Sequence, residues 1–345
     1  MIGLCGNVAV GKATSNGQTI KTRIVLDEIR RCFPNEEIDI VDTVHIRLSP
    51  AKEMFHLIKL INKSDRIVIL PAFSAINILS LLISFFRKHK STYYVVIGGW
   101  LPDMLRKRRS LKNQVKKYAG VYVETHNMHE TLAEIGLDNV FYLPNCKPLV
   151  ESMPSHACIK YHFCTFSRIS KEKGIEIAIN AIREIKEKNN ELDIKLDIYG
   201  KPDDEYMNQF NMIRMDLPDY IEYCGVVDSK KASSVLKNYY ALLFPTYYHG
   251  EGFPGTILDA FASSLPVIAS DWKYNAEIIC EYKTGLIFES QSEQSLANAI
   301  QYSITHTNVF MNMRNNCFNE AKKYTPENAM KQFIQHLKDG RRECI

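Results

Sequence analysis

Residues 249–271 have the types and spacing needed to bind a phosphate beside a carbohydrate. Glu251 precedes a Gly-Phe-Pro-Gly turn, an apolar helical pattern follows the turn, and Asp259 comes eight residues after Glu251. The turn frees the backbone N–H groups of Gly252 and Phe253 at the positive end of the helix dipole, which favours an anion. Because eight residues is close to a whole number of helical turns, we expect both carboxylates to lie on one side. The pattern therefore predicts a site for a sugar nucleotide.

Two cations earlier in the chain supply the positive charge that such a site requires. Arg168 ends a predicted strand, and Lys173 opens the next helical pattern. When the glycosidic bond to a nucleoside diphosphate breaks, negative charge builds on the leaving phosphate and must be stabilised by groups already in place. The chain contains no Asp-x-Asp sequence of the kind that holds a divalent metal in many sugar transferases. An Arg fork and a Lys charge can replace the metal, so we expect no metal and no other cofactor; an ordinary surface Arg and Lys is the alternative.

Together these elements resemble the signature of the retaining family 4 glycosyltransferases (glycosyl transferases group 1) of the bacterial surface-polysaccharide type. That family has the GT-B fold and usually shows Glu, seven residues, Glu, with Gly-Phe directly after the first Glu; here the second acid is Asp259. Arg168 and Lys173 match the family's Arg-x4-Lys-Gly element, in which both cations hold the donor diphosphate. The resemblance implies that Glu251 orients the donor sugar and stabilises positive charge at its anomeric carbon, and that Asp259 binds the ribose.

The N-terminal loop allows two interpretations. Residues 6–12 match the start of a P-loop after a strand, but Ala13 stands where a magnesium-binding Ser or Thr is required, which argues against a nucleoside triphosphatase. The favoured interpretation extends the loop to residues 16–22, which resemble the NGQT-x-KT stretch of bacterial polysaccharide glycosyltransferases of the same family. Gly17 would then permit a close backbone approach to the donor, and Thr19 would start the helix.

Other residues are assigned to the donor and the acceptor. By resemblance, Gly225 and Val226 follow a strand at the place where backbone groups meet the nucleobase, whose identity the sequence does not give. Trp100 and His126 follow predicted strands of the first domain, where we expect the acceptor. Polar or packing roles are the alternative for both residues.

Two further residues precede Glu251 directly. Tyr248 and His249 are candidates to line the sugar pocket. Core or rim packing is the alternative interpretation for both.

The elements that must position these residues alternate along the chain as strand and helix. Short apolar runs separated by helical patterns are typical of mostly parallel sheets covered on both faces. The rhythm restarts near residue 162, after a stretch with two prolines, so we place a boundary near 151–158. We therefore expect an α/β fold with two Rossmann-like domains facing a cleft, residues 1–152 and 153–325. The resemblance implies that residues 326–345 form a helix that crosses back to the first domain.

Composition indicates the class of the protein and where in the cell we expect it. The chain has 345 residues, of which 46% are hydrophobic and 24% charged, as in folded globular proteins of two domains. Its nine cysteines form no Cys-x-x-Cys pair, which favours reduced thiols. The chain shows no secretory signal, and its longest apolar stretch, residues 76–86, is too short to span a bilayer. We expect a cytoplasmic protein.

Positive charge is concentrated between residues 87 and 117. This segment contains one acid, Asp103, and ten basic residues: Arg87, Lys88, Lys90, Arg106, Lys107, Arg108, Arg109, Lys112, Lys116 and Lys117. A solvated helical face is one interpretation, and peripheral docking on anionic lipid, at about 1 kcal/mol per basic residue, is another. Nucleic acid is the weakest option, because common RNA- and DNA-binding patterns are absent.

These observations combine into one functional hypothesis. We expect a metal-independent enzyme that moves a sugar from a nucleoside-diphosphate sugar to a hydroxyl of a glycan, with retention of configuration. A lipid-linked acceptor at the cytoplasmic membrane face, in capsule, lipopolysaccharide or exopolysaccharide synthesis, fits the basic segment. Two alternatives stay open: a non-catalytic GT-B protein that binds a nucleotide sugar beside a partner transferase, and a nucleotide-sugar epimerase on the same fold.

Overall fold

The alternating apolar runs form two parallel six-stranded sheets, each in its own structural unit. A computed structural model describes residues 1–10, 16–46, 49–149, 160–228 and 231–340. The first unit comprises Met1–Lys147 and Thr325–Ile345, and the second comprises Pro148–Tyr324. The boundary expected near 151–158 lies outside the described residues.

The first sheet has the strand order β2-β1-β3-β4-β5-β6, and all of its described pairs are parallel. Strands β1 and β3 are buried along their whole length, as expected for central strands with helices on both faces. The strands of this sheet are β1 (Ile2–Gly6), β2 (Ile38–Asp42), β3 (Arg66–Leu70), β4 (Thr92–Val95), β5 (Gly120–Val123) and β6 (Val140–Tyr142).

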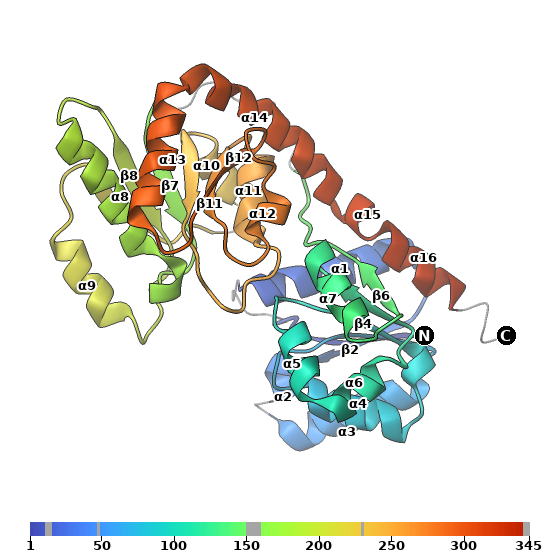
Figure 1. Cartoon of the computed structure of the whole chain (residues 1–345). Coiled ribbons are helices and arrows are strands. Elements are labelled where there is room, and N and C mark those ends of the chain that lie inside the picture. The colour runs from blue at the N-terminus through green and yellow to red at the C-terminus, as the bar shows by residue number, and fades with distance from the viewer. Residues whose placement is uncertain (11–15, 47–48, 150–159, 229–230, 341–345) are drawn as a thin grey trace. The chain divides into compact units, whose positions relative to one another are not determined.

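Helices cover both faces of this sheet (Figure 1). Alternate strand residues contact α1 and α16 on one face, and the intervening Gly3 of β1 lies against Leu60 of α3 on the other. The helices of this unit are α1 (Gly17–Cys32), α2 (Thr43–Ile46), α3 (Pro50–Lys63), α4 (Ile76–Phe85), η1 (His89–Ser91), α5 (Leu101–Lys107), α6 (Arg109–Val115), α7 (His126–Glu134), α15 (Pro326–Ala329) and α16 (Lys331–Asp339).

The C-terminal helix packs on the first unit, which confirms that the chain crosses back. The ring of Phe333 meets the ring of Tyr122 edge to face, with centroids 4.9 Å apart. The buried Arg66 guanidinium donates a hydrogen bond from Nη1 to the carbonyl oxygen of Leu337 at 3.0 Å. Buried apolar and polar contacts therefore both hold α16 on the sheet.

A side-chain cap and a non-helical residue set two helix boundaries in this unit. Helix α1 begins at Gly17, because the Asn16 side chain caps it by accepting a hydrogen bond from the Thr19 N–H at 2.8 Å. Thr19, expected to start this helix, instead lies buried in its first turn and donates to Asn7 Oδ1 at 3.0 Å. Helices α5 and α6 are divided at Arg108, whose backbone is non-helical (φ −125°, ψ 80°).

The second sheet has the strand order β12-β11-β10-β7-β8-β9, with all described pairs parallel. Strand β11 follows α11 directly in the chain and is completely buried. The strands of this sheet are β7 (His162–Phe166), β8 (Lys195–Tyr199), β9 (Ile221–Gly225), β10 (Ala241–Phe244), β11 (Val267–Ser270) and β12 (Gly285–Phe288).

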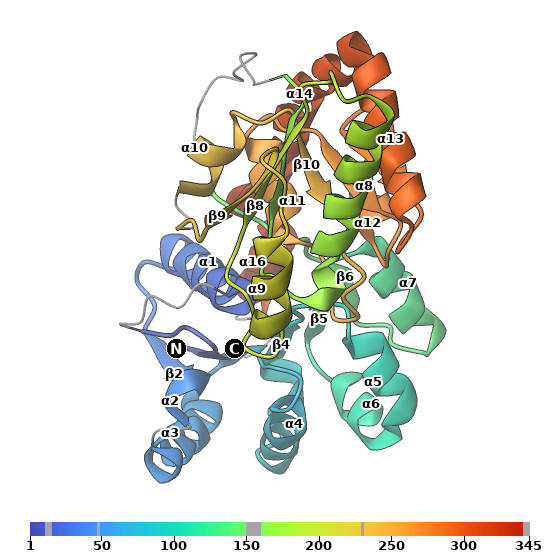
Figure 2. The ribbon, with the colours of Figure 1, turned by 90° about the vertical axis from the view of Figure 1, so that its left-hand side faces the viewer.

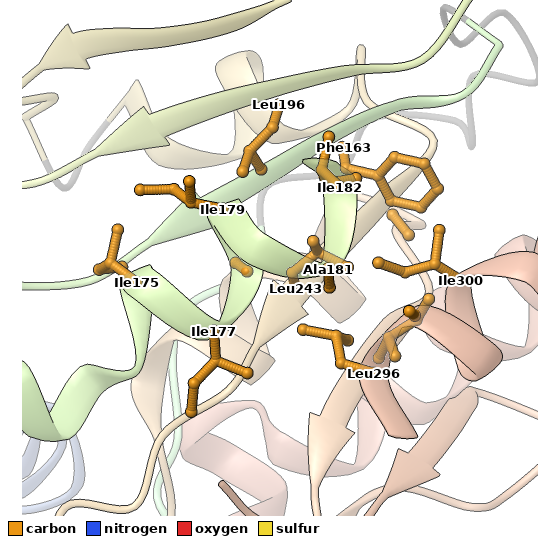
Figure 3. Packing of buried hydrophobic residues seen from close by; sticks show 14 of the residues in the cluster. Phe163, Ile175, Ile177, Ile179, Ala181, Ile182, Leu196, Leu243, Leu296 and Ile300 are labelled. Atoms are coloured by element: carbon orange, nitrogen blue, oxygen red, sulfur yellow. The ribbon is translucent and has the colours of Figure 1, made fainter. Parts of the chain in front are cut away.

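One hydrophobic cluster of the second unit lies between its sheet and two helices that run side by side, α8 and α13 (Figure 2). In Figure 3, Ile179 and Ile182 of α8 lie near Leu196 and Phe163 of the sheet, and α13 contributes Ile300. The helices of this unit are η2 (Lys171–Lys173), α8 (Ile175–Lys188), α9 (Met207–Met215), α10 (Ala232–Leu236), α11 (Gly255–Ala262), α12 (Asn275–Ile278), α13 (Glu293–Thr305), α14 (Thr307–Ala321) and η4 (Lys322–Tyr324).

Candidate functional site

The turn that carries Lys173 is held by a glycine. Lys173 ends the short helix η2, and Gly174 joins it to α8 with a left-handed backbone (φ 69°). A Cβ at Gly174 would lie 2.1 Å from the Pro245 carbonyl oxygen, so only glycine lets this turn approach the end of β10. The turn and the residues that follow β10 are therefore fixed against each other.

Lys173 and Glu251 form a buried ion pair at this contact. Lys173 Nζ lies 2.6 Å from Glu251 Oε2, and the two side chains are 10% and 11% exposed. The Thr246 hydroxyl donates to the same carboxylate oxygen at 3.1 Å and accepts a hydrogen bond from the Tyr248 N–H at 3.2 Å. The charge of Glu251 is thus balanced by a cation and by a hydroxyl from its own loop.

Tyr248 lies beside both cations. Its ring centroid is 4.9 Å from Lys173 Nζ and 6.0 Å from the Arg168 guanidinium carbon. Both distances are within the range in which a cation is attracted to an aromatic face. The Tyr248 carbonyl in turn accepts a hydrogen bond from the Trp272 indole N–H at 2.8 Å. The structure therefore brings together Arg168, Lys173, Tyr248 and Glu251.

Arg168 is held by an acid that sequence analysis did not assign to the site. Its Nη1 atom lies 3.0 Å from Asp203 Oδ2 and 3.2 Å from Asp203 Oδ1, and both side chains are partly exposed. Asp203 follows β8 in the chain, past Gly200 (φ 144°), where a Cβ would lie 1.7 Å from the Ser167 carbonyl oxygen. The glycine lets this segment pass close to the segment that carries Arg168. A long-range pair of this kind leaves no local signal in the sequence.

The turn before α11 differs from the expectation in one respect. The helix begins at Gly255, so Glu251 lies in the preceding loop, and the helical-turn argument for placing Glu251 and Asp259 on one side does not apply. Asp259 is half-buried in α11, and its backbone carbonyl accepts hydrogen bonds from Ser263. Gly252 and Phe253 are buried, and the Phe253 ring packs edge to face on Tyr324 with centroids 5.0 Å apart.

Gly225 and Val226 lie at the end of β9, as expected. The Gly225 carbonyl accepts a hydrogen bond from the Gly200 N–H at 2.8 Å, so the ends of β8 and β9 are tied together. Gly225 has a left-handed backbone (φ 80°), and the Val226 side chain is 67% exposed. An exposed apolar side chain at this edge offers a surface on which a planar base can pack.

Beside these residues, Asp197 organises a polar network that sequence analysis missed. Its carboxylate accepts a hydrogen bond from the Tyr239 hydroxyl at 2.5 Å and lies 3.0 Å from His162 Nε2. Potential ligand atoms of Asp197, Glu222 and Cys224 also lie within 4.8 Å of one another, which is close enough for a metal. Burial raises the pKa of the Cys224 thiol to about 11, so the thiol is protonated in this arrangement and can donate a hydrogen bond to Asp197. We interpret the cluster as a hydrogen-bond network.

In the first unit, the described part of the loop after β1 pairs two of its amides with a carboxylate of the protein. The Asp42 carboxylate accepts hydrogen bonds from the Val8 and Val10 N–H groups at 3.2 and 2.9 Å. Arg23 binds the carbonyl oxygens of Val8 and Ala9 at 2.8 and 2.7 Å. The Asp42 carboxylate therefore occupies the amides of Val8 and Val10, as a bound anion would. Gly11, Lys12 and Ala13 lie outside the described residues.

A buried ion pair organises the same end of this sheet. Lys21 Nζ lies 2.6 Å from Glu124 Oε1, with side chains 1% and 3% exposed. Glu124 Oε2 accepts a hydrogen bond from the Gly98 N–H at 3.0 Å. The pair links α1 to the end of β5, and Glu124 extends the link to the loop after β4; in the sequence, Lys21 stands out only as part of the residue 16–22 motif.

The remaining candidates are distributed over both units. Gly17 is exposed at the start of α1, and a Cβ there would have no neighbour within 4 Å. Trp100 donates from its indole N–H to the Ile97 carbonyl at 2.8 Å and packs edge to face on Phe73. His126 is exposed at the start of α7 and stacks on Tyr142, with centroids 4.0 Å apart. His249 is exposed in the second unit.

Comparisons with known proteins cover this site. The family model described as "Glycosyl transferases group 1" matches residues 160–324. A UDP-N-acetylglucosamine–peptide N-acetylglucosaminyltransferase GtfA subunit from Streptococcus agalactiae is 29% identical over 163 residues, 44% of this chain and 31% of the relative. A poly(glycerol-phosphate) alpha-glucosyltransferase from Bacillus subtilis is 24% identical over 249 residues, 65% of this chain and 35% of the relative. The chain thus spans about a third of the length of these curated relatives.

Solved structures share the fold at low sequence identity. Anabaena Alr3699/HepE in complex with UDP matches with a TM-score of 0.75 at 14% identity, over 98% of this chain and 99% of that one. The pneumococcal O-GlcNAc transferase GtfA, in complex with UDP and GlcNAc, matches with a TM-score of 0.65 at 18% identity, over 84% and 60% of the two chains. These matches show the GT-B fold. Within the described residues, no helix combines the length and apolar character that a membrane span requires.

Proposed function

We propose that this chain, whose second unit belongs to the glycosyl transferases group 1, is a retaining, metal-independent glycosyltransferase. It would transfer a sugar from a nucleoside-diphosphate sugar to a hydroxyl group of a glycan. One observation carries the proposal: Arg168, Lys173, Tyr248 and Glu251 converge in the unit that the family model matches.

The charges of this cluster suit the departure of a nucleoside diphosphate. In the reaction, the bond between the anomeric carbon and the β-phosphate oxygen breaks, and the acceptor oxygen bonds to the same face of that carbon. The acceptor proton passes to the leaving phosphate, so no added base is needed. Arg168 and Lys173 would take up the charge of that phosphate, and Glu251 would stabilise positive charge at the anomeric carbon. Asp259 would bind the ribose from α11.

Lys173 would interact both with the leaving phosphate and with Glu251, which would lie beside the sugar. In the structure its charge is balanced by Glu251 at 2.6 Å. A bound diphosphate would also interact with the Lys173 ammonium group. Lys173 would then neutralise the Glu251 carboxylate less, and that carboxylate would better stabilise the positive charge that develops on the sugar. The arrangement stabilises charge separation with groups that are already oriented, without a metal.

We further propose uridine diphosphate as the leaving group. The HepE and GtfA structures that share the fold were solved with UDP. In this chain, Gly225 and Val226 are the residues proposed to face the base, because they join two strand ends and expose an apolar side chain.

For the acceptor we propose a lipid-linked glycan of bacterial surface-polysaccharide synthesis at the cytoplasmic membrane face, with basic residues 87–117 facing anionic lipid. The support is charge: Arg106, Lys107, Arg108, Arg109, Lys116 and Lys117 are all exposed. A polyanionic acceptor is the second candidate, since the named acceptor of the Bacillus relative is a poly(glycerol-phosphate) and the same cations would bind its phosphates.

Thermal shift with UDP in EDTA tests the donor site. We expect UDP to stabilise the wild-type chain without metal and to lose this effect in Arg168→Ala. Arg183→Ala is the matched control, because Arg183 pairs with Asp216 at 3.0 Å elsewhere in the second unit. Equal shifts in wild type and Arg168→Ala, or a requirement for magnesium, would overturn the assignment.

Mass spectrometry of products from a panel of UDP-sugars tests the reaction itself. The panel is run with a lipid-linked acceptor, with poly(glycerol-phosphate) and without an acceptor. Sugar transfer to an acceptor is expected. Epimerisation leaves the mass of the donor unchanged, so the reaction without an acceptor is also followed by NMR. Conversion of the donor to its epimer there indicates an epimerase, and UDP binding without turnover on any acceptor favours the non-catalytic alternative.

A further inference from the structure

Helix α4 exposes a continuous row of apolar side chains. Ile78, Leu81 and Phe85 are 53%, 62% and 79% exposed. Their spacing of three and four residues places them on one side of the helix. The opposite side of α4 is already buried, with Ile76 and Ile83 fully covered. The three exposed side chains are therefore not needed to hold the helix on the sheet.

Helix α3, which packs beside α4, adds one aromatic residue and several cations to this row. Phe55 is 71% exposed, and Lys52, Lys59 and Lys63 are exposed on the same helix. The core side of α3 is formed by other residues, Leu57, Leu60 and Ile61.

Helix α6 packs on the other side of α4 and continues the positive charge. Arg109 opens α6, and Lys116 and Lys117 follow it, all exposed. Figure 1 shows α3, α4 and α6 together on one side of the first sheet. We call this surface the α3–α4–α6 face. It has a row of apolar side chains with basic residues on both sides.

Acidic side chains contribute little to this face. Helices α4 and α6 contain no Asp or Glu, and Glu53, the acid of α3, is 14% exposed and lies 3.9 Å from His56. A face with an apolar centre and a basic border is complementary to an anionic bilayer, whose headgroups attract the cations while the acyl boundary accepts the apolar side chains. A protein partner would require acidic groups opposite these cations, and a second copy of this face would place cation against cation.

We propose that the α3–α4–α6 face docks in the surface of an anionic lipid bilayer, with Leu81 and Phe85 inserted at the headgroup boundary. The membrane contact proposed above rested on the charge of residues 87–117; this inference adds the apolar row that makes the contact stable, and it deepens that proposal. Lipid binding requires neither donor nor acceptor, so it can be measured apart from glycosyl transfer.

Co-sedimentation of the full chain with vesicles tests the inference. Vesicles of phosphatidylcholine alone are compared with vesicles that contain about 30 mol% phosphatidylglycerol. The test variant is Leu81→Ser with Phe85→Ser. The matched control is Met212→Ser with Met215→Ser, which removes exposed apolar side chains (67% and 89%) from α9 of the second unit.

We expect the wild type and the α9 control to bind the anionic vesicles, and the α4 variant to bind at least about 10-fold more weakly. Added salt should weaken the wild type, because it screens the basic border. The UDP thermal shift of the α4 variant should match that of the wild type, which separates a failure of this inference from a failure of the donor assignment. Three outcomes would overturn it: no wild-type binding to anionic vesicles, equal binding by the α4 variant, or self-association of the wild type that the α4 variant abolishes.

Discussion

Lys173 Nζ lies 2.6 Å from Glu251 Oε2, and the two side chains are 10% and 11% exposed. The lysine follows β7 and the glutamate follows β10, so the pair joins two loops at one end of the second sheet. A buried pair has consequences for stability as well as for chemistry, because either charge becomes costly when its partner is removed.

We therefore predict that Glu251→Gln lowers both turnover and stability. Turnover should fall by about 10²-fold or more, as expected for the loss of charge stabilisation in the transition state. The free energy of unfolding should fall by about 3 kcal/mol, since Lys173 is left buried without its counter-ion. Urea unfolding and steady-state kinetics measure the two effects.

A double variant separates charge balance from packing. Lys173→Met with Glu251→Gln should recover part of the lost stability but none of the activity, because the buried charge is gone together with the catalytic groups. Glu184→Gln is the control: Glu184 pairs with Lys188 on the exposed face of α8, and its loss should cost less than about 1 kcal/mol. Additive losses in the double variant would contradict a coupled pair.

Asp203→Asn should raise the affinity for UDP about two- to fivefold. Asp203 holds Arg168 at 3.0 Å, so a diphosphate must compete with this carboxylate for the guanidinium. An exposed pair is worth at most about 1 kcal/mol, which sets the size of the effect. Isothermal titration calorimetry with UDP measures it.

Asp204→Asn is the control for this prediction, because it removes one negative charge from the neighbouring position. We expect its UDP affinity to stay close to that of the wild type. The same increase in both variants would indicate a general charge effect, and no increase in Asp203→Asn would show that the pair does not compete with the ligand.

Gly17→Ala should leave the fold intact and weaken binding of the donor. The substitution adds a methyl group at an exposed position with no neighbour within 4 Å, in the first turn of α1, so thermal unfolding should not change. If the backbone of Gly17 approaches the donor as the sequence motif implies, the methyl group will obstruct that approach. Kinetics with a UDP-sugar should then show a raised KM for the donor.

Gly174→Ala provides the contrasting variant. Its methyl group would meet the Pro245 carbonyl oxygen at 2.1 Å in a left-handed backbone, so we expect loss of stability before any specific effect on the donor. Unchanged kinetics in stable Gly17→Ala would show that Gly17 is an ordinary helix start.

The features that depend on the local pattern of residues could be predicted from the sequence. The parallel sheets follow from apolar runs such as Arg66–Leu70, which is buried along its whole length. The convergence of Lys173 and Glu251 could be anticipated because both follow strands of one parallel sheet, whose carboxyl ends meet at one edge.

Partners far apart in the chain could not be predicted in the same way. The Arg168–Asp203 contact depends on the close passage at Gly200, and the Lys21–Glu124 pair joins residues 103 positions apart. Neither pair has a periodic signal. Asp259 lies in the expected helix, but the start of that helix at Gly255 leaves Glu251 in the preceding loop, a boundary that hydrophobic spacing does not report.

Asp42 should make the free energy of unfolding of the first unit fall at acidic pH. Burial alone would raise the pKa of this carboxyl, but hydrogen bonds from the backbone N–H groups of Val10, Val44, Ala9 and Val8 together hold the pKa below its usual value. A carboxyl with a lowered folded-state pKa contributes stability that is complete above its unfolded pKa, about 3.9, and is lost as the pH falls through the folded value. We therefore expect Asp42→Asn to be less stable than the wild type at pH 7, by about 1–3 kcal/mol, because its amide cannot accept all of these hydrogen bonds.

The difference between Asp42→Asn and the wild type should shrink as the pH falls below about 4, where the wild-type carboxyl becomes protonated. Urea unfolding at a series of pH values, followed by hydrogen exchange in β1 and α1, measures the difference within the first unit. Asp27→Asn is the control, since Asp27 is 73% exposed and lies 3.8 Å from Arg30 on the surface of α1. A deficit for Asp42→Asn that stays constant from pH 7 down to pH about 3 would mean that the amide bonds to Asp42 do not depend on its charge, and that the loop after β1 is held mainly by Arg23.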